Sequence, residues 1–334
     1  MKRAGGLYRQ IATYENLCLA FWKAARGKQD RREVIAFDNS FDDRLRKLQK
    51  ELISHAPDIG HYRFFKVYDP KQRSICAAAF AERVLHHAVM NLCEPVLEAY
   101  AIHDSYACRK GKGARKALAR AQGFARKYDW YLKLDIRKYF DTIDHRILLD
   151  LLGRRFKDKE LMRLFEKLFE TYHTAPGKGM PIGNLISQHL ANFYLGAFDH
   201  WIKEEQRIKG YLRYMDDMVV FGQDRAALKA LLKRIGHYLD RNLALRLKDA
   251  VALNRCRHGL TFLGYRVYPD KILLSARSKR RFIYKFRQYE QMWQSGQWST
   301  RTLVRHMEPL IDFSRAAAAQ GLRRNVMERF GVSS

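Results

Sequence analysis

The sequence contains no apolar stretch of roughly 18 to 20 residues, the length that a helix needs to cross a bilayer. Its first six residues, Met-Lys-Arg-Ala-Gly-Gly, do not begin the apolar core of a secretory signal peptide. The five cysteines are scattered without a Cys-x-x-Cys pair, which argues against a zinc knuckle and a disulfide framework. We therefore expect no membrane association and a location in a reducing cytoplasm.

Acidic residues are few beside the basic ones. The 334 residues include 63 Lys and Arg against 35 Asp and Glu, which gives a formal net charge of +28. An excess of this size favours a polyanionic partner, and nucleic acid is the best candidate because phosphate neutralisation would use the charge directly. An anionic membrane surface is the competing partner, but no spanning segment supports it.

Internal repeats and low-complexity linkers are also absent, so we expect one continuous, interdigitated fold. Strand-like and helical segments mix without a regular βαβ repeat, which indicates the α+β class. Helical spacing of apolar residues marks the ranges 41–53, 80–92, 161–172, 190–202 and 228–239, and the basic segment from 275 onward. Strand-like patterns mark 130–135, 245–253 and 260–268, and 61–75 is expected to form a two-stranded arm that turns at Asp69 and Pro70.

Two adjacent carboxylates, Asp216 and Asp217, stand in the middle of an apolar run from Gly210 to Gly222. The β-favouring residues on both sides predict a hairpin with the aspartates at its turn. Two like charges side by side are unfavourable unless cations neutralise them. The pair therefore suits Mg²⁺, which proteins usually hold with one or two carboxylates and substrate phosphates. For the pair alone, an exposed Asp-Asp turn without chemistry is the alternative.

A third carboxylate, Asp135, ends a strand-like segment. Together with Asp216 and Asp217 it would hold two Mg²⁺ ions about 3.5–4 Å apart. One ion would lower the pKa of a primer 3′-hydroxyl, and the other would neutralise the triphosphate and the leaving pyrophosphate. Asp141 and Asp144 are alternatives, but they follow the strand and would equally well cap the next helix.

With these residues in order, the chain resembles a reverse transcriptase across nearly its whole length. The resemblance implies a right-hand polymerase fold with fingers, a palm of antiparallel sheet with packed helices, and a small helical thumb. The expected boundaries are 1–128 for an N-terminal extension and fingers, 129–270 for the palm with a fingers insertion near 151–187, and 271–334 for the thumb.

The resemblance also implies the metal site. In that family the strand Asp and the first Asp of the Tyr-x-Asp-Asp box ligate the metals, here Asp135 and Asp216. Asp217 completes the acidic cluster, and Ile136 belongs to the expected metal-site positions. Two Mg²⁺ ions are the expected cofactor, with Mn²⁺ as a substitute.

Nucleotide and nucleic-acid contacts follow from the same resemblance. The aromatic residue five positions after the strand Asp would exclude a ribose 2′-hydroxyl, and ordinary core packing is its alternative. The expected nucleotide-binding residues are Lys71, Arg73, Phe140 as that gate, Ile182, Gly183, Gln188 and Lys248 near the leaving pyrophosphate. The segment 105–113 resembles the next family block, which enters a helix. A primer grip is expected at Phe262, Leu263, Gly264 and Tyr265. In the thumb, Arg277, Arg280 and Arg281 would follow the minor groove of an RNA–DNA duplex, unless the helix is only a solvated amphipathic one.

The segment from Met180 to Gln188 departs from the usual family pattern. Most reverse transcriptases have Gln before its Gly and Pro after its Ser, where this chain has Ile182 and Gln188. An Ile-Gly-x-x-x-Ser-Gln box resembles the reverse transcriptases of diversity-generating retroelements, whose cDNA synthesis is error-prone opposite template adenines. A Gln at position 182 would hydrogen-bond the nucleotide or nearby backbone, whereas Ile only packs, so discrimination would weaken. A packing variant of ordinary fidelity is the alternative.

For that subgroup the expected ligands are a template-repeat RNA, the RNA–cDNA duplex and dNTPs, and the expected partner is a small basic pentameric accessory variability protein. The sequence has no further acidic constellation for an RNase H, no His-Asn-His-like endonuclease and no Cys-rich appendage, which favours the same subgroup. The alternatives are a retron or group II intron-like reverse transcriptase of ordinary fidelity, and a catalytically inactive RNA-binding relative.

Overall fold

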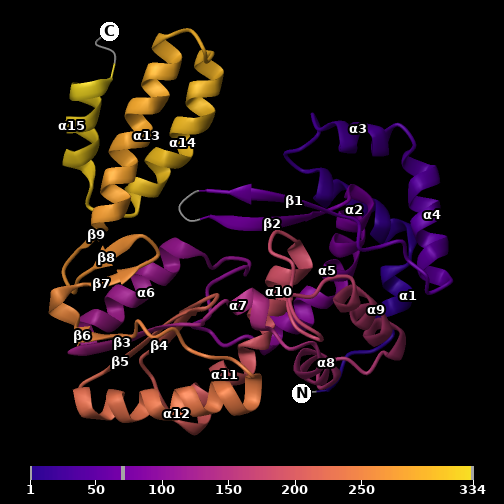
Figure 1. Ribbon diagram of the computed structural model, residues 1–334, viewed down its shortest axis with the longest axis horizontal. Helices are drawn as coiled ribbons and strands as arrows, with labels where there is room; N and C mark the ends of the chain where they lie inside the picture. Colours follow the sequence, from indigo (N-terminus) through magenta and orange to yellow (C-terminus); the bar gives the residue numbers. More distant parts are fainter. Residues whose placement is uncertain (1, 69–71, 332–334) are drawn as a thin grey trace. The chain divides into compact units, whose positions relative to one another are not determined.

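The computed structural model describes residues 2–68 and 72–331 (Figure 1). The chain divides into two compact units, and each is assembled from three separated segments. The first unit consists of Met1–Cys108, Asp135–Arg207 and Arg234–Lys248, and the second of Arg109–Leu134, Ile208–Lys233 and Asp249–Ser334. The chain therefore passes from one unit to the other five times, and one of these passages separates Leu134 from Asp135.

The first unit opens with helices. These are α1 (Leu7–Ile11), α2 (Tyr14–Ala25), α3 (Arg32–Asp38), α4 (Phe41–Ile53) and α5 (Phe80–Tyr100). Helix α2 packs along α5. The predicted helix at 41–53 is confirmed. Helix α5 continues beyond the predicted range and through Pro95, because Cys93 and Leu97, one turn apart, are both buried on the same side of the helix.

The predicted two-stranded arm is confirmed. Strands β1 (Tyr62–Val67) and β2 (Arg73–Ala78) pair antiparallel, and Tyr62 lies opposite Ala78. The turn expected at Asp69 and Pro70 lies outside the described residues, as does Lys71. Only the inner end of the arm is buried, so its outer half is open to a ligand.

The rest of the first unit is mainly helical. It contains α7 (Tyr139–Thr142), α8 (His145–Gly153), α9 (Lys159–Glu170), α10 (Leu185–Tyr194), α11 (Gly196–His200) and a π-helix, η1 (Trp201–Glu205). The apolar face expected along 190–202 is thus divided among three elements. Within it, Gly196 approaches Tyr100 so closely that a Cβ would lie 2.7 Å from the ring, and Trp201 stacks on Tyr238 with centroids 4.4 Å apart.

A four-stranded sheet organises the second unit. Its strands are β3 (Trp130–Asp135), β4 (Tyr211–Tyr214), β5 (Asp217–Gly222) and β6 (Ala252–Arg255), in the order β4-β5-β3-β6. Helix α6 (Ala114–Lys127) packs against β4, and α12 (Arg225–Leu243) follows β5. The apolar residues of β3 and β5 are buried, as a central position in a sheet requires.

The prediction of a strand at 245–253 is mostly wrong. Strand β6 begins only at Ala252, and the preceding residues contain no strand. Leu245 is fully buried, and Leu247 forms an isolated antiparallel bridge with Ile136. The alternating leucines therefore reflect packing within the first unit, before the chain passes to the second one after Lys248.

The second unit ends with a small sheet and three helices, drawn in orange and yellow in Figure 1. Strands β7 (Leu260–Phe262), β8 (Tyr265–Val267) and β9 (Ile272–Leu274) form an antiparallel meander, and α13 (Ala276–Gln294), α14 (Thr300–Arg315) and α15 (Gln320–Phe330) follow. The helices share a core of Phe282, Phe286, Met307 and Val326. The helical C-terminal segment is confirmed, whereas 260–268 is a hairpin rather than one strand. No helix in the described ranges is long and apolar enough to cross a membrane.

Candidate active site

The adjacent aspartates lie at a tight hairpin, as predicted. Tyr214 pairs with Asp217, so Met215 and Asp216 form a two-residue turn between β4 and β5. Met215 has a φ of 55°, whereas Asp216 keeps an ordinary negative φ, a combination typical of a type II′ turn. A non-glycine residue in this conformation costs on the order of 1–3 kcal/mol, and such outliers gather at functional sites.

A buried arginine supports this turn. Arg213 in β4 is 1% exposed, and its Nη1 donates to the carbonyl oxygen of Met215 at 3.0 Å. The sequence interpretation missed this residue. The signal was present, because a guanidinium inside an apolar strand is costly unless it is hydrogen-bonded there for a purpose.

Lys133 in β3 contacts the second aspartate of the pair. Its Nζ lies 3.2 Å from Oδ2 of Asp217, and both side chains are about three-quarters buried. Strands β3 and β5 are neighbours in the sheet. Since residues two apart in a strand share a face, Lys133 and Asp135 belong to the same face of β3. The sequence interpretation missed Lys133 as well, although that alternation was its signal.

Asp135, the last residue of β3, is paired with the expected lysine. Nζ of Lys248 lies 2.6 Å from Oδ2 of Asp135, and the backbone N–H of Lys248 donates to the Asp135 carbonyl at 2.8 Å. A second backbone bond joins Arg137 to Arg246 at 2.8 Å, and Ile136 between them is fully buried. Two backbone hydrogen bonds thus fix the position of the Lys248 side chain beside the carboxylate.

The Asp135 carboxylate has an oxygen atom of the kind that a hard divalent cation prefers. Oδ1 of Asp135 is buried and has no hydrogen-bond partner within residues 2–68 and 72–331, so it is available as a metal ligand. Over the same residues, no three His, Cys, Asp or Glu side chains are gathered into a ready-made metal cluster. Asp135 belongs to the first unit, and Asp216 and Asp217 belong to the second. Lysine ammonium groups neutralise Asp135 and Asp217 here.

Asp144 caps a helix, which was the alternative role expected for it. Its Oδ1 accepts from the backbone N–H groups of Arg146 and Ile147 at 3.1 and 3.2 Å, and so caps helix α8. The carbonyl of Asp141 accepts from the Thr174 hydroxyl at 2.6 Å. Neither residue is needed to explain a metal site.

The loop that carries Ile182 and Gly183 is fastened from two sides. The N–H of Met180 donates to the carbonyl of Phe140 at 2.8 Å, and the carbonyl of Ile182 accepts from Cys76 in β2 at 2.8 Å. Gly183 has a φ of 118°, and a Cβ there would lie 2.7 Å from Cγ2 of Ile75. Only glycine therefore lets the loop lie this close to β2.

The structure brings part of the expected nucleotide site together within the first unit. The Ile182 loop links the half-buried Phe140 to β2, whose first residue, Arg73, is exposed. Gln188 in α10 lies apart from these hydrogen bonds. Its Oε1 is 3.5 Å from Sγ of Cys108, a half-buried thiol whose pKa is raised by burial.

The expected primer grip is a second tight turn. Phe262 pairs with Tyr265, and the turn residues Leu263 and Gly264 have φ of 50° and 87°, the signature of a type I′ turn. Tyr265 donates its hydroxyl proton to the carbonyl of Phe313 in α14 at 2.6 Å. Burial, opposed by the Arg115 charge and assisted by Asp312, raises the pKa of Tyr265 to about 12, so this donor persists at neutral pH.

The three expected thumb contacts share one helix. Arg277, Arg280 and Arg281 all lie in the first two turns of α13, and all three side chains are exposed. The N-terminus of this helix is capped by Ser275, whose side chain accepts from the N–H of Ser278 at 3.2 Å. Three cations close together on an exposed helix suit contact with a phosphate backbone.

Comparisons with known proteins agree with this interpretation. Residues 67–267 match the model of the family described as reverse transcriptase (RNA-dependent DNA polymerase). Protein YkfC of Escherichia coli is 27% identical over 275 residues, which cover 67% of this chain and 71% of that protein. The group II intron-encoded protein LtrA of Lactococcus lactis is 29% identical over 142 residues, 40% of this chain but 23% of its own length.

Other relatives are also longer intron proteins. A putative COX1/OXI3 intron 2 protein of Saccharomyces cerevisiae is 22% identical over 251 residues, 56% of this chain and 29% of that protein. This chain thus spans less than a third of the length of the intron proteins it matches. Among solved structures, apo telomerase from Candida tropicalis aligns with a TM-score of 0.52 at 10% identity, covering 88% of this chain and 65% of that one.

The telomerase likeness shows the fold alone, and it confirms the expected right-hand polymerase fold. The family model covers more than half of the sequence, including β3, both aspartates of the β4–β5 turn and the expected primer grip. The chain belongs to the reverse transcriptase family of RNA-dependent DNA polymerases.

Proposed function

We propose that Asp135, Asp216 and Asp217 form the catalytic centre of nucleotide addition to a primer. The observation that carries this proposal is the placement of these carboxylates at the ends of β3 and β5, two neighbouring strands. When bound, two Mg²⁺ ions would activate the primer hydroxyl and neutralise the leaving pyrophosphate. Mn²⁺ would substitute.

The residues of the chain would supply the positioning. Asp135 is held beside Lys248 by the backbone hydrogen bonds to residues 246–248, and Arg213 fixes the turn that presents Asp216. Phe140 would act as the gate against a ribose 2′-hydroxyl. Lys248 lies at the carboxylate, from where it would neutralise charge that develops on pyrophosphate.

We expect Asp216→Asn to lower the rate of primer extension on an RNA template by on the order of a hundredfold or more, as the loss of a group that stabilises transition-state charge does. The matched control is Asp270→Asn, the same chemical change at an exposed loop position. Extension is measured with purified protein, Mg²⁺, dNTPs and a primed RNA. Equal rates for the two variants would refute the assignment.

We further propose that this polymerase belongs to a diversity-generating retroelement and makes adenine-directed errors while copying a template-repeat RNA. Ile182 and Gln188 support this proposal. The backbone of Ile182 is bonded to β2, so its half-buried side chain has a fixed position, and it offers no hydrogen bond that would reward a correct base pair.

Restoring the polar group, as in Ile182→Gln, should lower the substitution frequency opposite template adenine by roughly tenfold, the range that one hydrogen bond can supply. Sequencing of cDNA made on an RNA that contains all four bases measures this frequency. Ile35→Gln, at an exposed position of α3, is the matched control. An adenine error rate that Ile182→Gln leaves unchanged would sink the subgroup mechanism.

A reverse transcriptase of ordinary fidelity, similar to those of group II introns or retrons, is the second candidate. LtrA and the other intron-associated relatives favour it. The same sequencing decides between the two, because wild-type cDNA would then carry no excess of errors opposite adenine.

For the diversity-generating function we propose a template-repeat RNA and a small basic pentameric accessory protein as partners. Both proteins would be basic, so either RNA or a specific polar and apolar patch would join them. Co-elution in size-exclusion chromatography that requires the RNA would indicate bridging, and co-elution without RNA would indicate the patch. We also propose the subdomain boundaries. Residues 1–128 form an N-terminal extension and the fingers, 129–270 the palm with a fingers insertion near 151–187, and 271–334 the helical thumb.

A further inference from the structure

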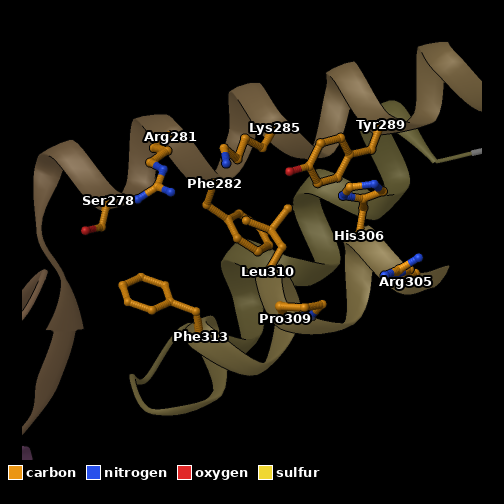
Figure 2. A pocket seen from close by; sticks show the side chains of 10 residues that line it. All are labelled: Ser278, Arg281, Phe282, Lys285, Tyr289, Arg305, His306, Pro309, Leu310 and Phe313. Atoms are coloured by element: carbon orange, nitrogen blue, oxygen red, sulfur yellow. The ribbon is translucent and has the colours of Figure 1, made fainter. Parts of the chain in front are cut away.

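A groove with a volume of about 330 Å³ lies between helices α13 and α14. This volume is at the lower end of the roughly 300–1,000 Å³ that small-molecule sites occupy. Figure 2 shows the groove and the side chains that line it, which come from both helices. They are Ser278, Arg281, Phe282, Lys285, Tyr289, Arg305, His306, Pro309, Leu310 and Phe313. The proposed catalytic residues do not include any residue of this groove, and Arg281 alone among its residues is expected to contact a duplex.

The charge of the groove has one sign. Arg281, Lys285 and Arg305 contribute three cations, and none of the ten lining residues is acidic. Lys285 lies near the middle and is half-buried, while Arg281 and Arg305 stand toward the two ends (Figure 2). Spacing of four residues places Arg281 and Lys285 on the same side of α13. An anion such as a phosphate would therefore be contacted from more than one direction.

The floor of the groove is apolar and partly aromatic. Phe282 and Leu310 lie at its centre, and Phe313 closes one end with a ring that is 36% exposed (Figure 2). At the other end Tyr289 and His306 lie with ring centroids 5.4 Å apart, and they add polar ring atoms. An apolar, partly aromatic surface beside cations matches a nucleotide, which has a π-face and a phosphate.

The groove is continuous with the expected primer grip. The ring of Phe313 lies against Tyr265, with centroids 4.7 Å apart. A Cβ on Gly264 would lie 3.0 Å from Cζ of Phe313 and 3.0 Å from Oγ of Ser278, so the β7–β8 turn touches two lining residues. A strand that passes the turn would reach the groove without leaving the protein surface.

We propose that this groove binds one unpaired nucleotide of a nucleic-acid strand. The base rests on Leu310 and Phe313, above the buried Phe282, and the phosphate lies on Lys285 between Arg281 and Arg305. This assignment rests on the proposed polymerase function for the presence of nucleic acid, but it adds a second contact point for a single strand. Either the RNA or the cDNA strand has this chemistry.

The test measures binding without polymerisation, so it stays informative even if the proposed catalytic assignment fails. The full chain is titrated into fluorescein-labelled 12-nucleotide single-stranded RNA, single-stranded DNA of the same sequence and a blunt RNA–DNA duplex, in EDTA and at constant salt. The variant Lys285→Gln/Arg305→Gln removes two groove cations. Its control, Lys279→Gln/Arg287→Gln, removes two exposed cations from other faces of α13.

We expect the groove variant to lose about tenfold in affinity for single strands relative to the control, as the removal of charge-assisted hydrogen bonds predicts. The affinity for the duplex should fall no further in the groove variant than it falls in the control variant. A selective loss for RNA assigns the nucleotide to RNA, and an equal loss for both single strands assigns it to either strand. Equal effects of both double variants, or a loss confined to the duplex, would overturn the proposal.

The base contact is tested separately with Phe313→Leu, which keeps apolar bulk but removes the ring. Single-strand affinity should fall at least fivefold, about the lower end for the loss of one stacked base. Phe313→Tyr should keep the wild-type affinity. Unchanged thermal midpoints show that both variants remain folded. If Phe313→Leu binds single strands as tightly as the wild type does, then no base stacks at this position.

Discussion

Lysine side chains lie beside two of the three carboxylates that are expected to bind metal. Lys248 contacts Asp135 and Lys133 contacts Asp217, with N–O distances of 2.6 and 3.2 Å. A cation near a carboxylate satisfies the same electrostatic need as a metal ion, so each lysine both prepares the site and competes with the metal. Lys248 was expected near the nucleotide phosphates, whereas Lys133 follows only from knowing which strands are neighbours.

Lys133→Gln should therefore raise the affinity for Mn²⁺ about fivefold, which corresponds to the ~1 kcal/mol at the upper end for an ion pair near the surface. Electron paramagnetic resonance of free Mn²⁺ during a titration measures this affinity without any polymerase assay. Lys229→Gln, at an exposed position of α12, is the control and should leave the affinity unchanged. An affinity that Lys133→Gln does not alter would mean that the metal does not displace this lysine.

We expect His87 in α5 to make the free energy of unfolding depend on pH. Burial, followed by the charges of Lys28, His86, Lys23 and His189, lowers the pKa of His87 to about 4. In the unfolded chain the pKa returns to about 6.5, so between pH 6.5 and 4 the unfolded state binds the extra proton. The free energy of unfolding should therefore fall as the pH drops through this window, and all of this contribution is lost below pH 4.

Thermal unfolding of wild type and His87→Gln at pH 7 and pH 4.5 tests this assignment. His87→Gln removes the titrating side chain, so the unfolding midpoint of the variant should fall less between pH 7 and pH 4.5. Other groups titrate in the same range in both proteins, and the difference between the two slopes isolates His87. If the unfolding midpoints of both proteins fall by the same amount between the two pH values, then folding does not keep His87 unprotonated.

At the scale of elements, helices and strands were predicted correctly where all residues of a segment favour the same backbone conformation. The strand ending at Asp135, the hairpin around Asp216 and the arm of β1 and β2 all had residues that favour one backbone conformation. The secondary-structure predictions failed where contacts with distant parts of the chain determine the local conformation. Residues 245–251 alternate like a strand but pack against other parts of the first unit, and the divided helix near Gly196 depends on a close approach of Tyr100. Neither contact is visible in a local sequence pattern.

The site could be predicted to a similar degree. Asp216 could be placed because apolar, β-favouring residues on both sides predict a hairpin turn. Gly264 was named only by resemblance, and its turn was not predicted because 260–268 read as one strand. The sequence carried a signal for Lys133 and for Arg213, but their partners could not be predicted, because each contact joins a side chain to another strand or to a turn whose conformation was unknown. These contacts depend on which distant segments of the chain pair with one another.

The Ile182 loop gives a prediction for one element. Gly183→Ala combines an unfavourable positive φ with a clash against Ile75 and the Cys76 carbonyl, so the loop should shift away from β2. Gly177→Ala shares the positive φ, 66°, but its Cβ would enter open space. We expect a destabilisation of about 1 kcal/mol for Gly177→Ala and at least twice that for Gly183→Ala.

Urea unfolding of both variants measures the difference, and primer extension reports whether the loop matters for synthesis. Both positions have a positive φ, so the excess loss in Gly183→Ala reports the contact with β2 together with the larger φ of 118°. If the two variants unfold at the same urea concentration, then the loop does not depend on that close approach.

For the whole molecule, the net charge of +28 predicts binding to nucleic acid that weakens steeply with salt. Neutralising Arg277, Arg280 and Arg281 together should lower the slope of log affinity against log salt by up to about 3, one for each phosphate that is no longer neutralised. Processivity on RNA should fall with it. Anisotropy titrations of a duplex between low and moderate salt measure the slope, and an unchanged slope together with unchanged processivity would mean that this face is only solvated.

The five passages of the chain between its two units have a consequence for synthesis on the ribosome. Strand β3 is translated by residue 135, but its neighbours β5 and β6 end only at residues 222 and 255. At about 5–20 residues per second, β3 waits several seconds or longer for its partners. Its leucines, buried in the finished sheet, stay uncovered during that time. Neither unit can be produced from one uninterrupted stretch of coding sequence, so truncation is a poor way to study this protein.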